Sequence, residues 1–199
     1  MTAPYFSQYL GTLDAASKHL SCQTGYIQLD DKIAVLHQLT FALALLQKQR
    51  KQAAFEAIAV LEKILPFQNN EGAFPAYLHT YPWAADGATL VKIAAVFAII
   101  LKYYARYLPA TATLKWHQSF LLLKKYLLAK NFTATLVQCW LSLVLAFWEE
   151  RLAEFPVEEY IVQHQAQFSS DDWGWQLAFL QLAASVAPAS EPYRAIIHL

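Results

Sequence analysis

Strongly apolar segments with helical periodicity recur along this chain, each preceded by an aspartate or asparagine, and they set the main limit on its fold. The preceding residues lie at intervals of 56, 45 and 40 residues and are Asp30, Asp86, Asn131 and Asp171. Their side-chain oxygens can accept N–H groups that a first helical turn leaves unpaired. Strand patterns are nearly absent, so the sequence predicts an all-α fold.

The expected helices fall into two kinds. Apolar helices follow the four residues above, and more amphipathic helices lie between them, as a layered arrangement of helical hairpins requires. An irregular helical bundle is the alternative. A further helix is expected within 12–20, and Asp31 shares the first turn of the first long helix. The long helices are predicted at 30–47, 49–65, 86–108, 113–130 (beginning at Thr111 or Thr113), 131 to about 155, 156–168 and 171–187.

The balance of apolar and charged residues limits how the helices can be covered. Hydrophobic residues make up 57% of the 199 residues and charged residues 15%, against roughly 25% charged in an ordinary soluble domain. Helices must therefore be buried on more than one side, or apolar surface must meet a partner. The length suits one all-helical domain, residues 1–199.

Several classes of function are disfavoured. Lys plus Arg and Asp plus Glu both number 15, so there is no basic field to attract nucleic acid. The richest apolar run, 133–148, contains Gln138 and is shorter than the roughly 20 residues of a membrane span. No signal peptide is visible, and Cys22 and Cys139 are isolated. We therefore expect a cytoplasmic protein without membrane insertion.

One loop carries most of the functional information. Residues 67–87, "FQNNEGAFPAYLHTYPWAADG", combine five aromatic residues with a histidine, two prolines and two glycines, and are called the aromatic loop below. Pro75 and Pro82 stiffen it, and Gly72 allows a tight turn. Its beginning, Gln68 to Phe74, reads Q-x-x-x-G-x-F directly after a predicted helix.

This motif resembles the Gln/Gly/aromatic turn of α/α-toroid proteins, which include terpene cyclases and six-hairpin glycosidases. The resemblance is found mainly in residues 60–100. It implies that the glutamine side chain ties a helix end while the aromatic ring packs over it, in a partial toroid of about four hairpins. The acid motif D-x-D-D of protonating cyclases is absent, since "LDDK" and "SDDW" both miss it. An incomplete ring would expose its terminal helices, so a homodimer is expected.

The rings of the loop have two alternative fates. They could cover one end of the core, or they could line a binding surface over the N-terminal ends of the inner helices. Flat rings with polar edges stack on sugars, which indicates a carbohydrate or similar polar ligand. A later segment, 169–176, would add Trp175 and two aspartates at the same end. The candidate ligand-binding residues are Tyr77, His79, Tyr81, Trp83 and Trp173.

Catalysis is a weaker hypothesis than binding. Glycoside hydrolysis needs two carboxylates, and the candidates are Glu71, Asp86 and Asp172, with Asp171 beside them; helix capping explains Asp86 and Asp171 equally well. The six histidines form no HExxH, and no P-loop or G-x-G-x-x-G occurs, so no metal or cofactor is expected. The alternative function is a non-catalytic interaction or scaffold protein acting through a self-associating apolar surface.

Overall fold

The computed structural model describes residues 25–28, 31–133 and 135–151. The helices predicted at 12–20, 156–168 and 171–187 lie outside these ranges, as do Asp30, Asp171, Asp172, Trp173 and Trp175. The chain divides into two compact units; one comprises residues 12–131, and residues 132–151 belong to the other. A single domain over 1–199 therefore stays a prediction.

The described residues form helices joined by turns, with no strand and with an isolated β-bridge between Ala34 and Tyr77, so the all-α prediction is confirmed. The π-helical turn Ile100–Tyr104 and the 3-10 turn Ala105–Tyr107 extend α4, and further 3-10 turns lie at Leu65–Phe67 and Leu78–Thr80. The α-helices of the first unit are α2 (Val35–Gln47), α3 (Lys51–Ile64), α4 (Gly87–Ile99) and α5 (Ala110–Ala129), and α6 (Thr135–Trp148) belongs to the second.

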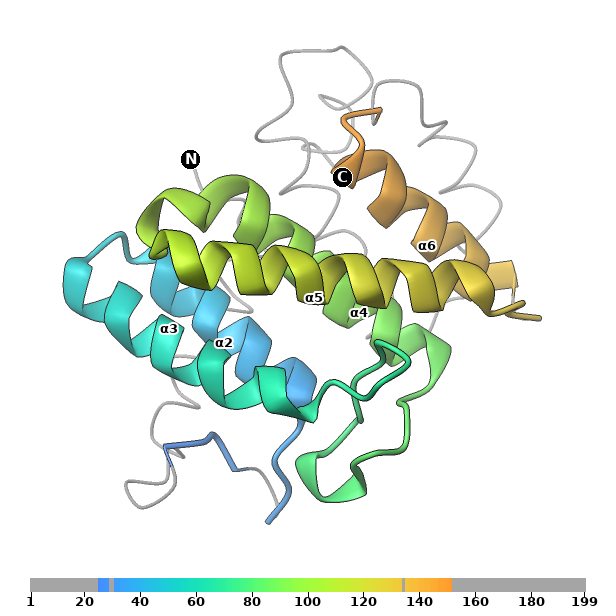
Figure 1. Cartoon of the computed structure of the whole chain (residues 1–199), viewed down its shortest axis with the longest axis horizontal. Coiled ribbons are helices and arrows are strands. Elements are labelled where there is room, and N and C mark those ends of the chain that lie inside the picture. The colour runs from blue at the N-terminus through green and yellow to red at the C-terminus, as the bar shows by residue number, and fades with distance from the viewer. Residues whose placement is uncertain (1–24, 29–30, 134, 152–199) are drawn as a thin grey trace, which may run out of the picture. The chain divides into compact units, whose positions relative to one another are not determined.

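Within the first unit, α2 and α3 form a hairpin, α4 packs against α2, and α5 packs across α4 (Figure 1). Most residues of α2 and α4 are buried, whereas α3 and α5 bury one face each. A helix that is apolar all round requires cover on all sides, and an amphipathic helix supplies it. The predicted alternation of the two kinds is thus confirmed for these four helices.

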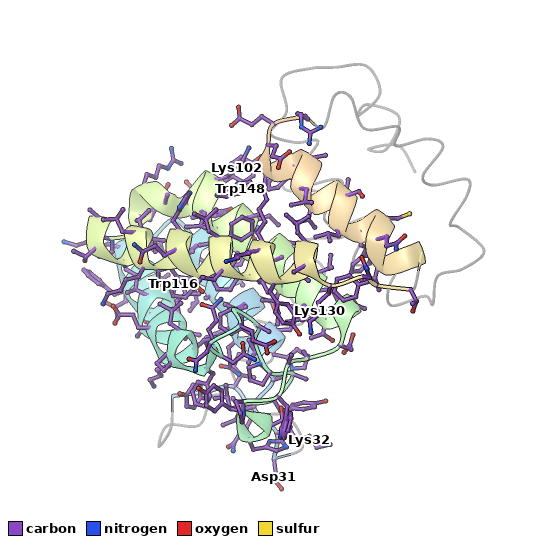
Figure 2. All side chains as sticks on the ribbon, turned by 45° about the vertical axis from the view of Figure 1, so that its right-hand side comes forward. Asp31, Lys32, Lys102, Trp116, Lys130 and Trp148 are labelled. Atoms are coloured by element: carbon purple, nitrogen blue, oxygen red, sulfur yellow. The ribbon has the colours of Figure 1, made fainter. Side chains whose placement is uncertain are left out.

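Aromatic side chains from three segments meet in the core of this unit. The ring of Phe97 in α4 lies 5.6 Å from that of Phe74 and 5.3 Å from that of Trp116, between ring centroids. All three side chains are almost completely buried, and Figure 2 labels Trp116 on α5. Because Phe74 belongs to the aromatic loop, the loop itself closes part of the core.

The predicted helix starts were correct at Asp86, agreed within two residues for α3 and α5, and were wrong for α2 and α6. Asp86 caps α4 by accepting the Thr89 N–H at 2.9 Å. Asp31, predicted to open the first helix, is exposed at φ 60° and lies four residues before α2. The first N–H of α2, on Val35, instead donates to the Ala76 carbonyl at 3.0 Å. Backbone from the loop therefore replaces the expected side-chain cap.

The start of α5 lies one residue before the predicted Thr111, and the start of α6 was misplaced. Pro109 is the N-cap of α5, without a side-chain hydrogen bond, and its fixed φ suits a helix beginning at the next residue. Asn131, the predicted cap of the fifth helix, is exposed and lies four residues before Thr135, where α6 begins.

The end of α6 comes earlier than predicted. The helix stops at Trp148 instead of near residue 155. The Arg151 N–H donates to the Ala146 carbonyl at 2.8 Å, and the Glu150 N–H to that of Phe147 at 3.3 Å. Glu150 has a φ of 62°. This is a Schellman motif with glutamate at the position that usually carries glycine.

In the part of the chain that the structure describes, one helical stretch, Gly87–Tyr107, has the length and apolar composition of a membrane span. Its most apolar window is 61% buried within the structure. The core helix of a soluble protein satisfies the same two criteria.

A candidate binding surface on the aromatic loop

Gln68 ties the beginning of the loop to α5. Its side-chain Nε2 donates to the Gly72 carbonyl at 2.8 Å and to the Ser119 carbonyl at 2.9 Å. The first bond closes the turn, and the second crosses to a helix 51 residues further along the chain. One amide therefore fixes both the shape of the turn and its position.

Gly72 brings the loop into direct contact with the same helix. Its φ is 96°, and a Cβ placed there would lie 2.6 Å from the carbonyl oxygen of Leu122 and 2.7 Å from its carbonyl carbon. Both the backbone conformation and the space require glycine. The tight turn predicted at Gly72 is confirmed.

Asn69 holds the two arms of the loop together, a role the sequence analysis missed. Its Oδ1 accepts the N–H groups of Glu71 at 3.1 Å and Ala73 at 2.9 Å, and its Nδ2 donates to the Pro82 carbonyl at 3.1 Å. Asparagine side chains commonly bond to the backbone two residues on. The sequence Asn69-Asn70-Glu71-Gly72 could have indicated this turn, but not the bond to Pro82.

The second arm of the loop lies at the N-terminal ends of both buried helices. Beside the Val35–Ala76 bond, the Leu78 N–H donates to the Ile33 carbonyl at 2.9 Å. The N–H of Ala85, the residue before the helix cap Asp86, donates to the Phe74 carbonyl at 2.8 Å. The starts of α2 and α4 therefore share one side of this unit, at the loop (Figure 1).

Tyr81 and Trp83 are the rings that this backbone displays. Trp83 is 77% exposed and Tyr81 44% exposed, and Pro82 between them is exposed as well. The Tyr81 ring meets Phe67 edge to face, with centroids 5.9 Å apart and an angle of 89° between the rings. One side of the Tyr81 ring therefore packs against Phe67, whereas most of the Trp83 side chain is exposed to solvent.

Tyr77 and His79 contact each other instead. Their rings stack with centroids 5.6 Å apart and planes at 16°. The Lys32 ammonium lies 5.6 Å from the centre of the Tyr77 ring. The Tyr77 ring therefore makes contacts within the chain, to His79 and Lys32. His79 is exposed beside it. Trp173, the fifth residue of the predicted ligand-binding set, lies outside the described residues.

The two described carboxylates differ in their surroundings. Asp86 uses both oxygens on Thr89, accepting its N–H at 2.9 Å and its hydroxyl at 2.7 Å. Partial burial raises the pKa of Asp86, but these bonds and those from backbone N–H groups outweigh it, so the pKa lies below its ordinary value. An ionised, hydrogen-bonded cap is a poor proton donor. Glu71 is exposed.

No group of three or more His, Cys, Asp and Glu side chains that could hold a metal ion occurs among the described residues. Searches against family models, curated proteins and solved structures found no match for the chain.

Proposed function

We propose that this protein binds a carbohydrate or a similar flat polar ligand on Trp83 and Tyr81. The observation that carries the proposal is the 77% exposure of Trp83 on a loop whose backbone is tied in several places. A backbone held in position before binding loses little conformational freedom when the ligand arrives. An exposed indole on such a backbone is suited to stacking.

The neighbours of Trp83 support a polar ligand. The Tyr81 ring combines an apolar face with a hydroxyl, and His79 on the same arm of the loop is exposed. These groups can exchange hydrogen bonds with ligand hydroxyls while the two rings contact an apolar sugar face. Because Asp86 is engaged as a helix cap, we propose binding without hydrolysis.

The proposal also includes a partial α/α toroid of about four hairpins. It is supported by the burial of α2 and α4 between less buried helices and by the starts of both at the aromatic loop. In such an arrangement a ligand would lie across the starting ends of the inner helices.

A glycan array probed with the full-length protein and with Trp83→Ala tests this function. We expect the wild-type protein to bind a limited set of glycans, and Trp83→Ala to lose about tenfold or more in affinity for them, measured afterwards by titration calorimetry. Tyr81→Ala should weaken binding less, since its ring is less exposed.

Phe55→Ala provides the matched control. Phe55 is an exposed aromatic residue, at 54%, but it lies on α3 and not on the loop. Its substitution should leave glycan affinity unchanged. The proposal fails if no glycan binds, or if Trp83→Ala and Phe55→Ala reduce binding equally.

A further inference from the structure

The balanced net charge of the chain hides an uneven distribution of its charged residues. The unit of residues 12–131 contains 13 of the 15 Lys and Arg residues but only 7 of the 15 Asp and Glu residues. Within this unit, the segments 32–55 and 87–131 contain no carboxylate at all. The end of the unit away from the aromatic loop is built from these two segments, so it carries charge of one sign.

Three cations occupy the turn between α2 and α3. Lys48, Arg50 and Lys51 lie within four residues of one another, and all three are exposed. The turn is tight, because Gln49 adopts a left-handed conformation at φ 50°. Phe55, one helical turn beyond Lys51, is 54% exposed, and the Lys51 ammonium lies 6.0 Å from the centre of its ring. The cluster of Lys48, Arg50, Lys51 and Phe55 is called the basic corner below.

The end of α4 adds a further cation at the same end of the unit. The Tyr104 side chain forms a hydrogen bond with that of Gln47, the last residue of α2. The α2–α3 turn and the end of α4 therefore lie together, away from the aromatic loop (Figure 1). Arg106 is exposed here, with its guanidinium carbon 4.8 Å from the centre of the Tyr107 ring and its Nη2 donating to the Tyr107 hydroxyl at 3.0 Å.

Folding does not explain why the cations are at this position. Arg50 is the N-cap of α3 and Lys51 its first residue, and the helix has neither a side-chain cap nor an acidic residue in its first turn. The start of a helix carries partial positive charge, so cations there lower stability. Serine or aspartate would cap the helix better. Residues that break a local rule in this way commonly mark a functional position.

We propose that the basic corner, together with Arg106, binds the surface of a membrane that contains anionic lipids. Lys and Arg side chains are attracted to the phosphates and carboxylates of such a surface. An exposed aromatic ring among them can enter the boundary between headgroups and acyl chains, as Phe55 would. The α2–α3 turn lies at the outer edge of the unit, where a flat surface can reach it (Figure 1).

A single-stranded nucleic acid fits this end of the unit less well. Proteins that bind such strands combine a positively charged groove with several rings on which successive bases stack. The basic corner is a turn between two helices, and it displays one ring, that of Phe55. The ring of Tyr107 is already covered on one side by Arg106.

Vesicle sedimentation with the full-length protein tests the proposal. The probes are vesicles of phosphatidylcholine with about one third phosphatidylserine, and vesicles of phosphatidylcholine alone. We expect the protein to bind the anionic vesicles at least about tenfold more strongly. Added salt should reduce this difference, because it screens exposed charges.

Two double variants with the same loss of charge make the test specific. Arg50→Ser with Lys51→Gln should weaken binding to anionic vesicles about tenfold or more. It also places a good N-cap before α3, so the midpoint of thermal unfolding should stay level or rise. Lys125→Gln with Lys130→Gln removes two exposed cations from the other end of α5, and should change vesicle binding by less than about threefold.

Four results would overturn the proposal. The first is absence of binding to anionic vesicles. The second is equal binding to both kinds of vesicle. The third is an equal loss in the two double variants, which would show that net charge decides and not the basic corner. The fourth is a single-stranded oligonucleotide that displaces the protein from vesicles and binds less well to the Arg50→Ser, Lys51→Gln variant, which would identify nucleic acid as the partner.

Discussion

The side-chain amide of Gln68 donates to the backbone carbonyl of Ser119 at 2.9 Å, and so joins the aromatic loop to the middle of α5. The same nitrogen closes the turn at Gly72. Main-chain carbonyls are thus the acceptors on both sides, and their positions do not depend on rotamers. Tyr81 and Trp83 lie further along the same loop, so this bond helps to hold the backbone that carries them.

Replacing Gln68 should destabilise the protein, and a negatively charged replacement should destabilise it more than a neutral one. Gln68→Met removes the donor and should cost about 1–3 kcal/mol. Gln68→Glu should cost more at pH 7, because a carboxylate cannot donate and would face two carbonyl oxygens. Urea unfolding monitored by circular dichroism measures both free energies.

The pH dependence separates these effects. Repulsion from the two carbonyls should raise the folded-state pKa of the introduced carboxyl, so the variant gains stability relative to Gln68→Met as the pH falls toward 5. Equal stability of the two variants at all pH values would contradict the bonding described at Gln68.

Local signals in the sequence predicted part of this loop. Glycine at position 72 and aspartate before α4 were identified from short-range rules, because a turn and an N-cap depend on a few neighbouring residues. The start of α2 was missed because its first N–H bonds to Ala76, about 40 residues away. Nothing near Asp31 in the sequence reveals that partner.

The sequence was also insufficient to rank the candidate ligand-binding residues of the aromatic loop. Composition grouped Tyr77, His79, Tyr81 and Trp83 as equivalent candidates. The structure separates them by their contacts, since Tyr77 stacks on His79 whereas Trp83 is mostly exposed. Exposure depends on how the arms of the loop are held, which includes the long-range bond from Asn69 to Pro82.

Gly72→Ala should be one of the most destabilising single changes in the loop. The new methyl group would lie 2.6 Å from the Leu122 carbonyl oxygen and 2.7 Å from its carbonyl carbon. Both of these are backbone atoms, which cannot move aside as the end of a flexible side chain could. A residue with a Cβ is also strained at a φ of 96°. We expect a loss of about 2–4 kcal/mol in urea unfolding. A loss below 0.5 kcal/mol would show that the loop does not pack against α5 in this way.

Gln49→Gly, unlike Gly72→Ala, should not lower the free energy of unfolding. Gln49 follows α2 at a φ of 50°, and its N–H bonds to the Leu46 carbonyl at 3.1 Å. Glycine adopts this conformation without a Cβ penalty, so we expect stability to stay level or to rise by up to about 1 kcal/mol. Gln49→Val at the same exposed site should lower it. Thermal unfolding of the two variants gives the comparison, and a more stable valine variant would contradict the left-handed conformation.

Asp86→Ala should weaken the start of α4 by about 0.5–2 kcal/mol, and Asp86→Asn by less, because asparagine also accepts the Thr89 N–H. The folded-state pKa of Asp86 is below its ordinary value. Its ionised form therefore contributes stability above the unfolded-state pKa of about 4, and this contribution is lost as the pH falls through the folded-state value. Urea titrations at several pH values should show the wild-type advantage over Asp86→Asn shrinking in acid. An advantage that grows in acid would contradict the capping role.

Gln38→Leu should release the segment before α2 from the core. Gln38 is fully buried, its Oε1 accepts the Ile27 N–H at 3.0 Å, and its Nε2 donates to the Ile27 carbonyl at 2.7 Å. Leucine has a similar volume but would leave both groups of Ile27 without a partner, at about 1–3 kcal/mol for each that stays buried. If the segment detaches, water pairs these groups and the loss is the burial of Ile27. Amide hydrogen exchange distinguishes the two results. Detachment speeds exchange at Ile27 while α4 stays protected, whereas a uniform increase across α2 and α4 indicates that the whole unit has lost stability.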